Sequence, residues 1–228
     1  MKKIFMAILA VVLVVIVGGA VFVFAFDKKV PTEWFSSQVE EVKNSKLVED
    51  EKLPKKAAFF HEVITYTKDG DKTVETYSEK MYLEYKDNST EDAENYEIKS
   101  KNYDSQGKLS EEYTTRYYKE GEVSYREEKG NKQEISDLSE AKMFFMYFLE
   151  FYNNEGTALN SVVIDYIDNH LDHISQKGLS ITLHMVGDNT KLAITYGLVS
   201  KKIEKVELTL DNYTNDVLTS RLHEYAVL

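Results

Sequence analysis

The sequence predicts an α+β fold, in which an N-terminal transmembrane helix precedes a curved antiparallel β-sheet (a half-barrel) with two helices inserted mid-chain against its concave face. Three observations lead to this fold class. An apolar run without a charge occupies residues 4–26. Two groups of segments alternate apolar and polar residues, as strands do, and two segments of helical period, 141–152 and 158–177, separate these groups. Short turns within each group require antiparallel pairing, because parallel strands need long crossovers.

The apolar run 4–26 is 23 residues long, and about 20 apolar residues suffice to cross a bilayer core. A cleaved signal peptide has a shorter apolar core, which favours a retained signal anchor, although Val23 and Ala25 also fit cleavage after Ala25. Lys2 and Lys3 favour a cytoplasmic N-terminus. We therefore expect a single-pass cell-membrane protein with an extracytoplasmic C-terminal domain, or a secreted domain if the chain is cleaved near Ala25.

Composition limits the cellular compartment and the classes of partner that the chain is expected to have. The 228 residues include no cysteine, which excludes disulfides and a lipid-modified N-terminal cysteine and fits a bacterial cell envelope. The net charge is −11, and residues 1–29 contribute +3 through four lysines and one aspartate, so the remainder carries −14. Such a charge argues against nucleic acid as a partner, since its binding requires clustered Lys and Arg.

Residues 30–56 are expected to form a juxtamembrane helix and a linker. Pro31 suits a first helical turn, apolar residues recur at helical spacing in the first half, and Pro54 ends the helix. The chain thus divides into a transmembrane signal anchor at 1–29, this connecting region, and one extracytoplasmic α+β domain at 57–228, which is long enough to bury a core.

Two groups of strands are expected from alternation and from the turn clusters between the segments. The first group comprises 57–67, 73–85, 96–103, 109–119 and 122–128. The second group comprises 179–186, 192–199, 203–210 and 217–227. Because a sheet of so many strands curls or splits, one curved sheet and two separate sheets both remain open.

The two central helices differ in their apolar faces. Asp137 and Glu140 have capping-box spacing ahead of 141–152, which reads AKMFFMYFLEFY and is apolar nearly all round. Such a helix is expected to be buried. The segment 158–177 carries one apolar stripe at helical spacing, and Gly178 suits its C-terminal end.

The helix 141–152 supplies the candidate ligand-binding residues. Six aromatic side chains gather there: Phe144, Phe145, Tyr147, Phe148, Phe151 and Tyr152. Further tyrosines line the expected strands: Tyr82, Tyr85, Tyr96, Tyr113, Tyr117 and Tyr125. Since small-molecule sites are mostly apolar cavities, we expect a cavity between helix and sheet for an apolar or lipidic ligand. A solid aromatic core is the alternative.

The five histidines do not match a known catalytic or metal-binding pattern. His170 and His173 lie three residues apart on an expected helix, among aspartates, but the i, i+4 pair of a zinc helix is absent. The His-Glu pairs at 61–62 and 223–224 lie on strands, where neighbouring side chains point to opposite faces. Nucleophile motifs and glycine-rich phosphate loops are absent. We predict no enzymatic activity, no metal and no cofactor, and retain a hydrolase built around His170 and His173 as the least favoured hypothesis.

The closing segment 201–228 reads KKIEKVELTLDNYTNDVLTSRLHEYAVL and follows the pair of expected helices. This order of elements over 57–228 resembles the lipoprotein-carrier-like half-barrel superfamily, which includes mycobacterial-type cell-envelope lipoproteins. The resemblance implies a half-barrel that holds lipid. The anchor cysteine of the lipidated members is absent here, so an uncleaved apolar helix would take the place of the lipid.

Two functions follow from these features. The first is a membrane-anchored extracytoplasmic module that binds an apolar or lipidic ligand at a bacterial cell envelope. The alternative is an envelope interaction or accessory protein with a solid core, which acts in a protein assembly. The expected partners are the membrane, through residues 4–26, and a lipid or an envelope protein, but no nucleic acid.

Overall fold

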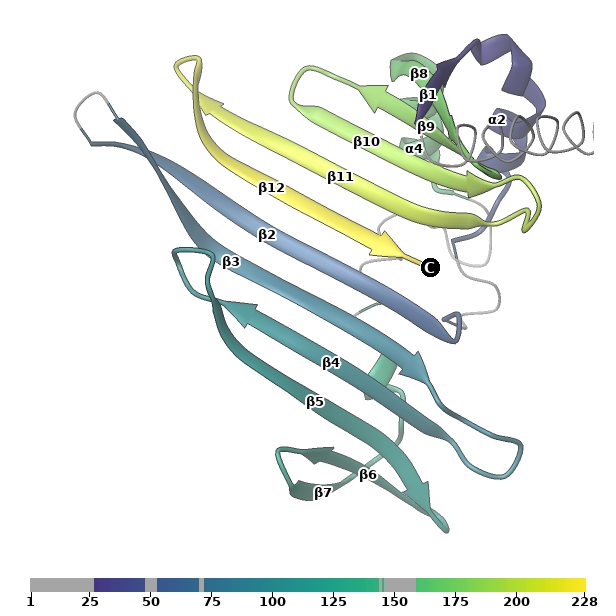
Figure 1. Cartoon of the computed structure of the whole chain (residues 1–228), viewed down its shortest axis with the longest axis vertical. Coiled ribbons are helices and arrows are strands. Elements are labelled where there is room, and N and C mark those ends of the chain that lie inside the picture. The colour runs from purple at the N-terminus through teal and green to yellow at the C-terminus, as the bar shows by residue number, and fades with distance from the viewer. Residues whose placement is uncertain (1–26, 48–52, 70–71, 144, 146–158) are drawn as a thin grey trace, which may run out of the picture.

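The described part of the chain is built around one open antiparallel sheet (Figure 1). The structure is a computed structural model, and it describes residues 27–47, 53–69, 72–143, 145 and 159–228. Twelve strands of these residues form the sheet. Strands that follow one another in sequence are mostly neighbours in space, so the sheet consists largely of hairpins.

Two meanders make up the sheet. The first contains β2 (Lys56–Asp69), β3 (Lys72–Asp87), β4 (Asn95–Tyr103), β5 (Leu109–Glu120), β6 (Val123–Glu128) and β7 (Asn131–Ile135). The second contains β8 (Leu171–Lys177), β9 (Ser180–Val186), β10 (Thr190–Gly197), β11 (Ile203–Thr214) and β12 (Val217–Val227), and the short β1 (Lys28–Val30) pairs with the outer side of β8. β12 pairs with β2, and this pairing, the junction, joins the two meanders within the sheet.

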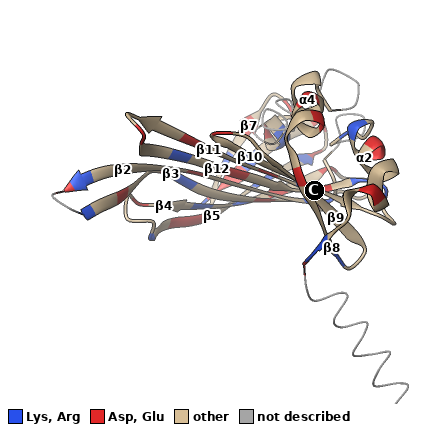
Figure 2. Cartoon of the chain, turned by 90° about the horizontal axis from the view of Figure 1, so that it is seen from above, with Lys and Arg blue, Asp and Glu red and all other residues tan. Residues whose placement is uncertain are grey.

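Helices lie on one face of this sheet. They are η1 (Thr32–Phe35), α2 (Ser36–Lys43), α4 (Ser161–His170) and a helical stretch that begins at residue 140. Val42 of α2, Ile167 of α4 and Phe145 belong to the same buried cluster as the inward-facing strand residues. We call this side of the sheet the covered face and the opposite side the open face. Figure 2 shows α2 and α4 near one end of the sheet, while β2 and β3 extend far beyond them.

Alternation along the strands accounts for the two faces. In β9, Ile181, Leu183 and Met185 are fully buried, whereas the residues between them are partly exposed. The register places these three side chains on the same face as Leu192 and Ile194 of β10. Burying one face and leaving the other wet is the usual arrangement for antiparallel meanders.

The expected α+β half-barrel with an N-terminal transmembrane helix is wrong. The described chain is mostly β, with twelve strands and only short helices. No helix among the described residues is long and apolar enough to cross a membrane, and the run 4–26 lies outside the described residues. Of the two arrangements left open for the strands, the structure has the single antiparallel sheet.

The expected helix 158–177 is wrong in its second half. α4 begins after Asn160, whose side chain accepts a hydrogen bond from the backbone N–H of Val163 at 2.9 Å, and it ends at His170. The residues that follow form β8. A bulge between Leu171 and His173 lets Leu171 and Ile174 face the core from one strand, and their spacing of three residues imitates a helix.

The nine expected strands correspond to β2–β6 and β9–β12, whereas β1 and β7 were not expected. β7 reads NKQEI and is exposed along most of its length, so it offers no apolar alternation to recognise. β1 and the helical residues that follow it join the same core. There Val39 and Val42 are buried, and Glu41 accepts hydrogen bonds from the Tyr196 hydroxyl (3.0 Å) and Lys201 Nζ (2.8 Å).

Candidate functional site

Four aromatic side chains form a buried group on the covered face of the first meander. They are Tyr85 of β3, Tyr96 of β4, Tyr117 of β5 and Phe145, and we call them the aromatic cluster. Their exposed fractions are 0%, 6%, 8% and 1%, respectively. The ring of Tyr85 stacks on Tyr96 at 6.0 Å between centroids and meets Phe145 at 5.7 Å. Such ring pairs add to the stabilisation from burial alone.

The hydroxyl groups of this cluster differ in whether they have a hydrogen-bond partner. The Tyr96 hydroxyl accepts a hydrogen bond from Lys142 Nζ at 3.2 Å, and the same ammonium lies 4.5 Å from the Tyr96 ring centroid. Among the described residues, the buried Tyr85 hydroxyl has no hydrogen-bond partner, and neither has the buried Nε of Arg126 on the same face. Burial raises the pKa of Tyr85, and Asp87 and Tyr96 add to this effect. Tyr85 therefore offers a neutral donor without an acceptor.

The candidate ligand-binding residues of the sequence are only partly described by the structure. Phe145 lies in the aromatic cluster, fully buried against Tyr85. The other five lie outside the residues whose side chains the structure describes: Phe144, Tyr147, Phe148, Phe151 and Tyr152. The tyrosines of the strands divide between the faces. Tyr85, Tyr96, Tyr113 and Tyr117 face the covered side, whereas Tyr82 and Tyr125 face the open side. Alternation within each strand is the signal that separates them.

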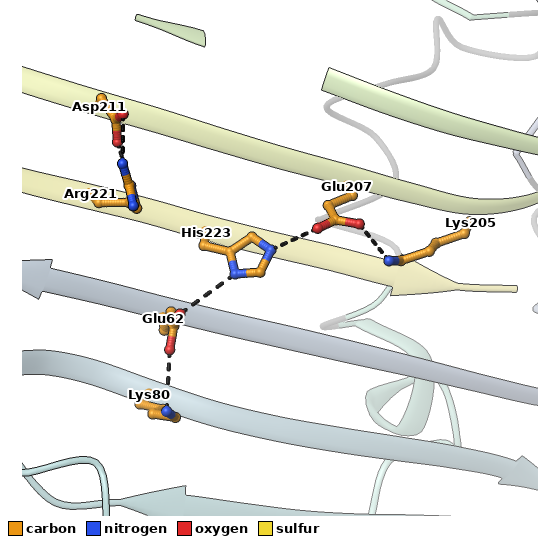
Figure 3. A network of polar contacts seen from close by, with 7 residues as sticks. All are labelled: Glu62, Lys80, Lys205, Glu207, Asp211, Arg221 and His223. Carbon is orange, nitrogen blue, oxygen red and sulfur yellow. Dashed lines mark hydrogen bonds and ion pairs between the residues drawn. The ribbon is translucent and has the colours of Figure 1, made fainter. Parts of the chain in front are cut away.

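The open face carries a chain of ion pairs that crosses β3, β2, β12 and β11. Figure 3 shows His223 between two carboxylates, with Nε2 at 3.1 Å from Glu207 and Nδ1 at 3.5 Å from Glu62. Lys80 extends the chain from Glu62 at 3.3 Å, and Lys205 pairs with Glu207. The hydrogen bond with His223 lowers the pKa of Glu207 to about 2, with help from Lys205.

Aromatic rings lie among these charges. Phe60 stacks on Tyr225 at 5.0 Å between centroids, with 19° between the ring planes. Lys205 Nζ lies 4.9 Å from the Tyr225 centroid, and Lys101 Nζ lies 5.8 Å from that of Tyr82. Cations over ring faces attract the ring electrons. The open face is therefore a polar and aromatic surface rather than an apolar one.

The two His-Glu dipeptides meet at the junction. The register sets His223 opposite Glu62 and Glu224 opposite His61, so each face of the sheet receives one histidine. His61 lies on the covered face, with Nδ1 at 2.6 Å from Glu224 and Nε2 at 3.1 Å from Glu79. Both ring nitrogens of each histidine face a carboxylate, and only the doubly protonated imidazolium can donate at both.

The pKa of both junction histidines is raised in keeping with this geometry. The hydrogen bond with Glu224 is the main cause for His61, and the hydrogen bond with Glu207 is the main cause for His223. Sequence reasoning separated the members of each dipeptide onto opposite faces, which is correct, but a single strand does not show that the two dipeptides pair with each other.

The remaining histidines are arranged differently from the sequence expectation. His170 ends α4, beside Tyr166 at 4.4 Å between ring centroids, whereas His173 lies on β8. His173 stacks on His184 at 4.3 Å, and His184 Nε2 lies 2.9 Å from Ser175 Oγ. Burial lowers the pKa of His184, and His173 adds to this effect. Among the described residues, no three metal-ligating side chains gather closely enough to hold a metal ion.

Comparison with known proteins found nothing similar to this chain. No family model matches it, and neither the curated proteins nor the solved structures contain a match. The resemblance to half-barrel lipoproteins therefore stays a prediction from the order of elements.

Proposed function

We propose that this protein is a membrane-associated binding protein whose ligand has an apolar body and a hydrogen-bond acceptor. The site is the aromatic cluster on the covered face, where residues 140–143 and 145 are helical. The observation that carries the proposal is the Tyr85 hydroxyl, which is fully buried and has no hydrogen-bond partner in the part of the chain that the structure describes.

A buried hydroxyl without a partner costs about 1–3 kcal/mol, so proteins rarely retain one without a use. A bound acceptor, such as a carboxylate or an ester carbonyl, would remove this cost. The rings of Tyr96 and Phe145 beside Tyr85 offer an apolar contact for the rest of the ligand. The ligand class is therefore an amphiphile of the kind found in lipid membranes.

The membrane part of the proposal rests on the sequence. Residues 4–26 carry no charge, and one residue separates them from Lys28, where β1 begins. We propose that this run associates the protein with the cell membrane and that the sheet lies on its extracytoplasmic side, in keeping with Lys2 and Lys3 at the start of the chain.

Native mass spectrometry on the full chain, extracted in a mild detergent, tests the ligand site. We expect a bound amphiphile on the wild-type protein and a lower bound fraction on Tyr85→Phe. Tyr96→Phe is the matched control, because the Tyr96 hydroxyl already has Lys142 as a partner. If no bound molecule is found on the wild-type protein, or if the two variants lose it equally, the Tyr85 site is wrong.

The open face favours a second candidate function, that of an accessory protein in an envelope assembly. No described helix covers this face, and it presents Phe60, Tyr225, Lys80 and Lys205 from neighbouring strands. Aromatic and charged side chains of this kind are typical of protein interfaces. Crosslinking in cells would then capture one reproducible partner, and Tyr225→Ala would reduce its yield. Unchanged capture by that variant would contradict this function.

A further inference from the structure

The first described residues lie at one particular corner of the sheet. Lys28 of β1 pairs with Gln176 of β8, so the chain enters the sheet beside the turn between β8 and β9. The turn between β10 and β11 lies next to it, because the backbone N–H of Leu198 donates to the carbonyl oxygen of Leu179 at 2.8 Å. Both turns are therefore close to Lys28, which follows the run 4–26 by two residues in the sequence.

These two turns present apolar side chains to solvent. Leu179 is 57% exposed and Val199 is 73% exposed. Turns ordinarily carry polar residues and glycine. Two exposed aliphatic side chains in neighbouring turns are therefore unusual. We call the surface around them the basic corner. Its members are Lys28, Lys29, Lys177, Leu179, Val199, Lys201 and Lys202.

The charge of this corner is opposite to that of the chain as a whole. Five lysines lie on β1, on the end of β8 and in the turn between β10 and β11. Residues 30–228 together carry −14, which is the chain total of −11 minus the +3 of residues 1–29. Two carboxylates also lie at this corner: Glu41 pairs with Lys201, and Glu204 accepts hydrogen bonds from the hydroxyls of Ser180 and Ser200 at the two turns. At the same end of the sheet, but in the first meander, the loop 87–94 carries four carboxylates and no Lys or Arg of its own; one of the four, Glu94, pairs with Lys119 of β5.

We propose that the basic corner rests on the membrane surface, with Leu179 and Val199 among the lipid headgroups and the lysines beside anionic lipids. Apolar tips with a basic rim bind at this interface through buried apolar area and through attraction to anionic lipid. Residue 26 and Lys28 are at most about 7 Å apart, so a membrane-inserted run 4–26 would hold the corner at that surface. The acidic loop 87–94 is repelled and stays away from the lipid.

This inference rests on the proposed membrane association, and the test separates the two. The chain contains no cysteine, so single cysteines introduced at chosen positions carry a fluorophore without ambiguity. The full chain is reconstituted into phosphatidylcholine vesicles containing about a quarter phosphatidylglycerol, with and without spin-labelled lipids that quench at the headgroup level. Labels are placed by Leu179→Cys and Val199→Cys at the corner, by Ala93→Cys in the acidic loop, and by Val217→Cys at the opposite end of the sheet.

We expect quenching at positions 179 and 199 to be at least about twofold stronger than at positions 93 and 217. Equal quenching at all four positions in vesicle-bound protein would overturn the corner while leaving membrane association intact. Protein that does not float with the vesicles would overturn both.

The role of charge has its own readout. In the Val199→Cys background, Lys29→Gln with Lys177→Gln is expected to lower quenching in the anionic vesicles and to leave it unchanged in pure phosphatidylcholine vesicles, where the lysines have no anionic lipid to attract. The matched control is Lys68→Gln with Lys72→Gln, at the far end of β2 and β3, which should change neither value. Loss of quenching in both kinds of vesicle would contradict an electrostatic contribution.

Discussion

The hydroxyl groups of Tyr85 and Tyr96 lie in the same aromatic cluster but have different surroundings. Lys142 supplies a donor to Tyr96, whereas no described residue offers a hydrogen-bond partner to the Tyr85 hydroxyl. The junction histidines show the opposite case, because each has an acceptor at both ring nitrogens. The Tyr85 hydroxyl thus gives the covered face a free donor for a proposed ligand. The two histidines make the stability of the junction depend on pH.

Tyr85→Phe is expected to raise the stability of the ligand-free protein by about 1 kcal/mol, since it removes a buried donor without a partner. Tyr96→Phe is expected to lower stability, because Lys142 then loses an acceptor. Urea unfolding monitored by circular dichroism measures both changes. A destabilised Tyr85→Phe protein would mean that the hydroxyl has a partner in solution and would remove the main support for the ligand site.

The junction histidines predict a stability that depends on pH. Their folded pKa lies above the ordinary value of 6.5, so their contribution is complete below that value and is lost as the pH rises through the raised pKa. The pKa of Glu207, lowered from 4.5 to about 2, acts in the other direction, and its contribution is lost as the pH falls toward that value. For these groups, stability is therefore expected to be greatest between pH values of about 4.5 and 6.5.

The double variant His61→Gln with His223→Gln is expected to lose about 2 kcal/mol at pH 6 and much less at pH 9. Glutamine keeps a hydrogen-bond donor but cannot gain a proton. The difference between the losses at pH 6 and pH 9 therefore measures the contribution of the imidazolium charge. Thermal unfolding across this pH range provides the measurement, and His170→Gln, at the exposed end of α4, is the control. A loss that is the same at both pH values would show that the charge of the histidines does not matter.

Among the larger elements, α4 is held to the sheet by a close approach at the turn between β9 and β10. The Tyr166 hydroxyl donates to the carbonyl oxygen of Thr190 at 2.9 Å. A Cβ atom at Gly187 would lie only 2.3 Å from that hydroxyl oxygen. The glycine is therefore required by space, and α4 and the hairpin constrain each other.

Gly187→Ala is expected to cost about 1–3 kcal/mol of folding free energy, because the hydroxyl must move away from its acceptor. In a Tyr166→Phe background the same substitution should cost less, since the nearest remaining ring atom lies at 3.2 Å. Chemical denaturation of the four proteins of this double-mutant cycle gives the coupling. If the destabilisation by the two substitutions is additive, the Tyr166 hydroxyl is not the group that excludes a larger residue at position 187.

Over the whole molecule, stability is expected to be uneven along the strands. The inner ends of β2 and β3 lie under the core, where Phe59, Leu83 and Tyr85 are buried or half-buried, whereas residues 72–76 of β3 are exposed. The outer ends of the hairpins depend on backbone hydrogen bonds and cross-strand pairs alone. Such regions open with smaller free energies than a covered core.

Hydrogen exchange measured by mass spectrometry should show this gradient within a single strand. We expect amides in residues 72–78 of β3 to exchange at least about tenfold faster than those in residues 81–86, although both segments are paired on the β2 side. Residues 181–185 of β9, under α4, should be among the slowest. Uniform protection along β3 would show that the long hairpins are stabilised by something other than the covered face.

Local patterns were enough to locate most strands and to assign their faces. Tyr85 and Leu83, for example, alternate with charged neighbours, and period-two alternation is a property of a single segment. The same reasoning failed at β8, where a bulge gives Leu171 and Ile174 the spacing of a helix, and at β7, where an edge strand is exposed along most of its length. Both errors contributed to the incorrect α+β class.

The sequence by itself therefore predicts the antiparallel strands, the net negative charge and the burial of Phe145. These features depend on composition and on neighbours in sequence. The pairing of β12 with β2 joins His61 to Glu224 across 163 positions. The described residues that surround the Tyr85 hydroxyl in space leave it without a hydrogen-bond partner. Only the folded chain decides such features, since hydrogen bonds and burial at these sites are made by residues from remote strands.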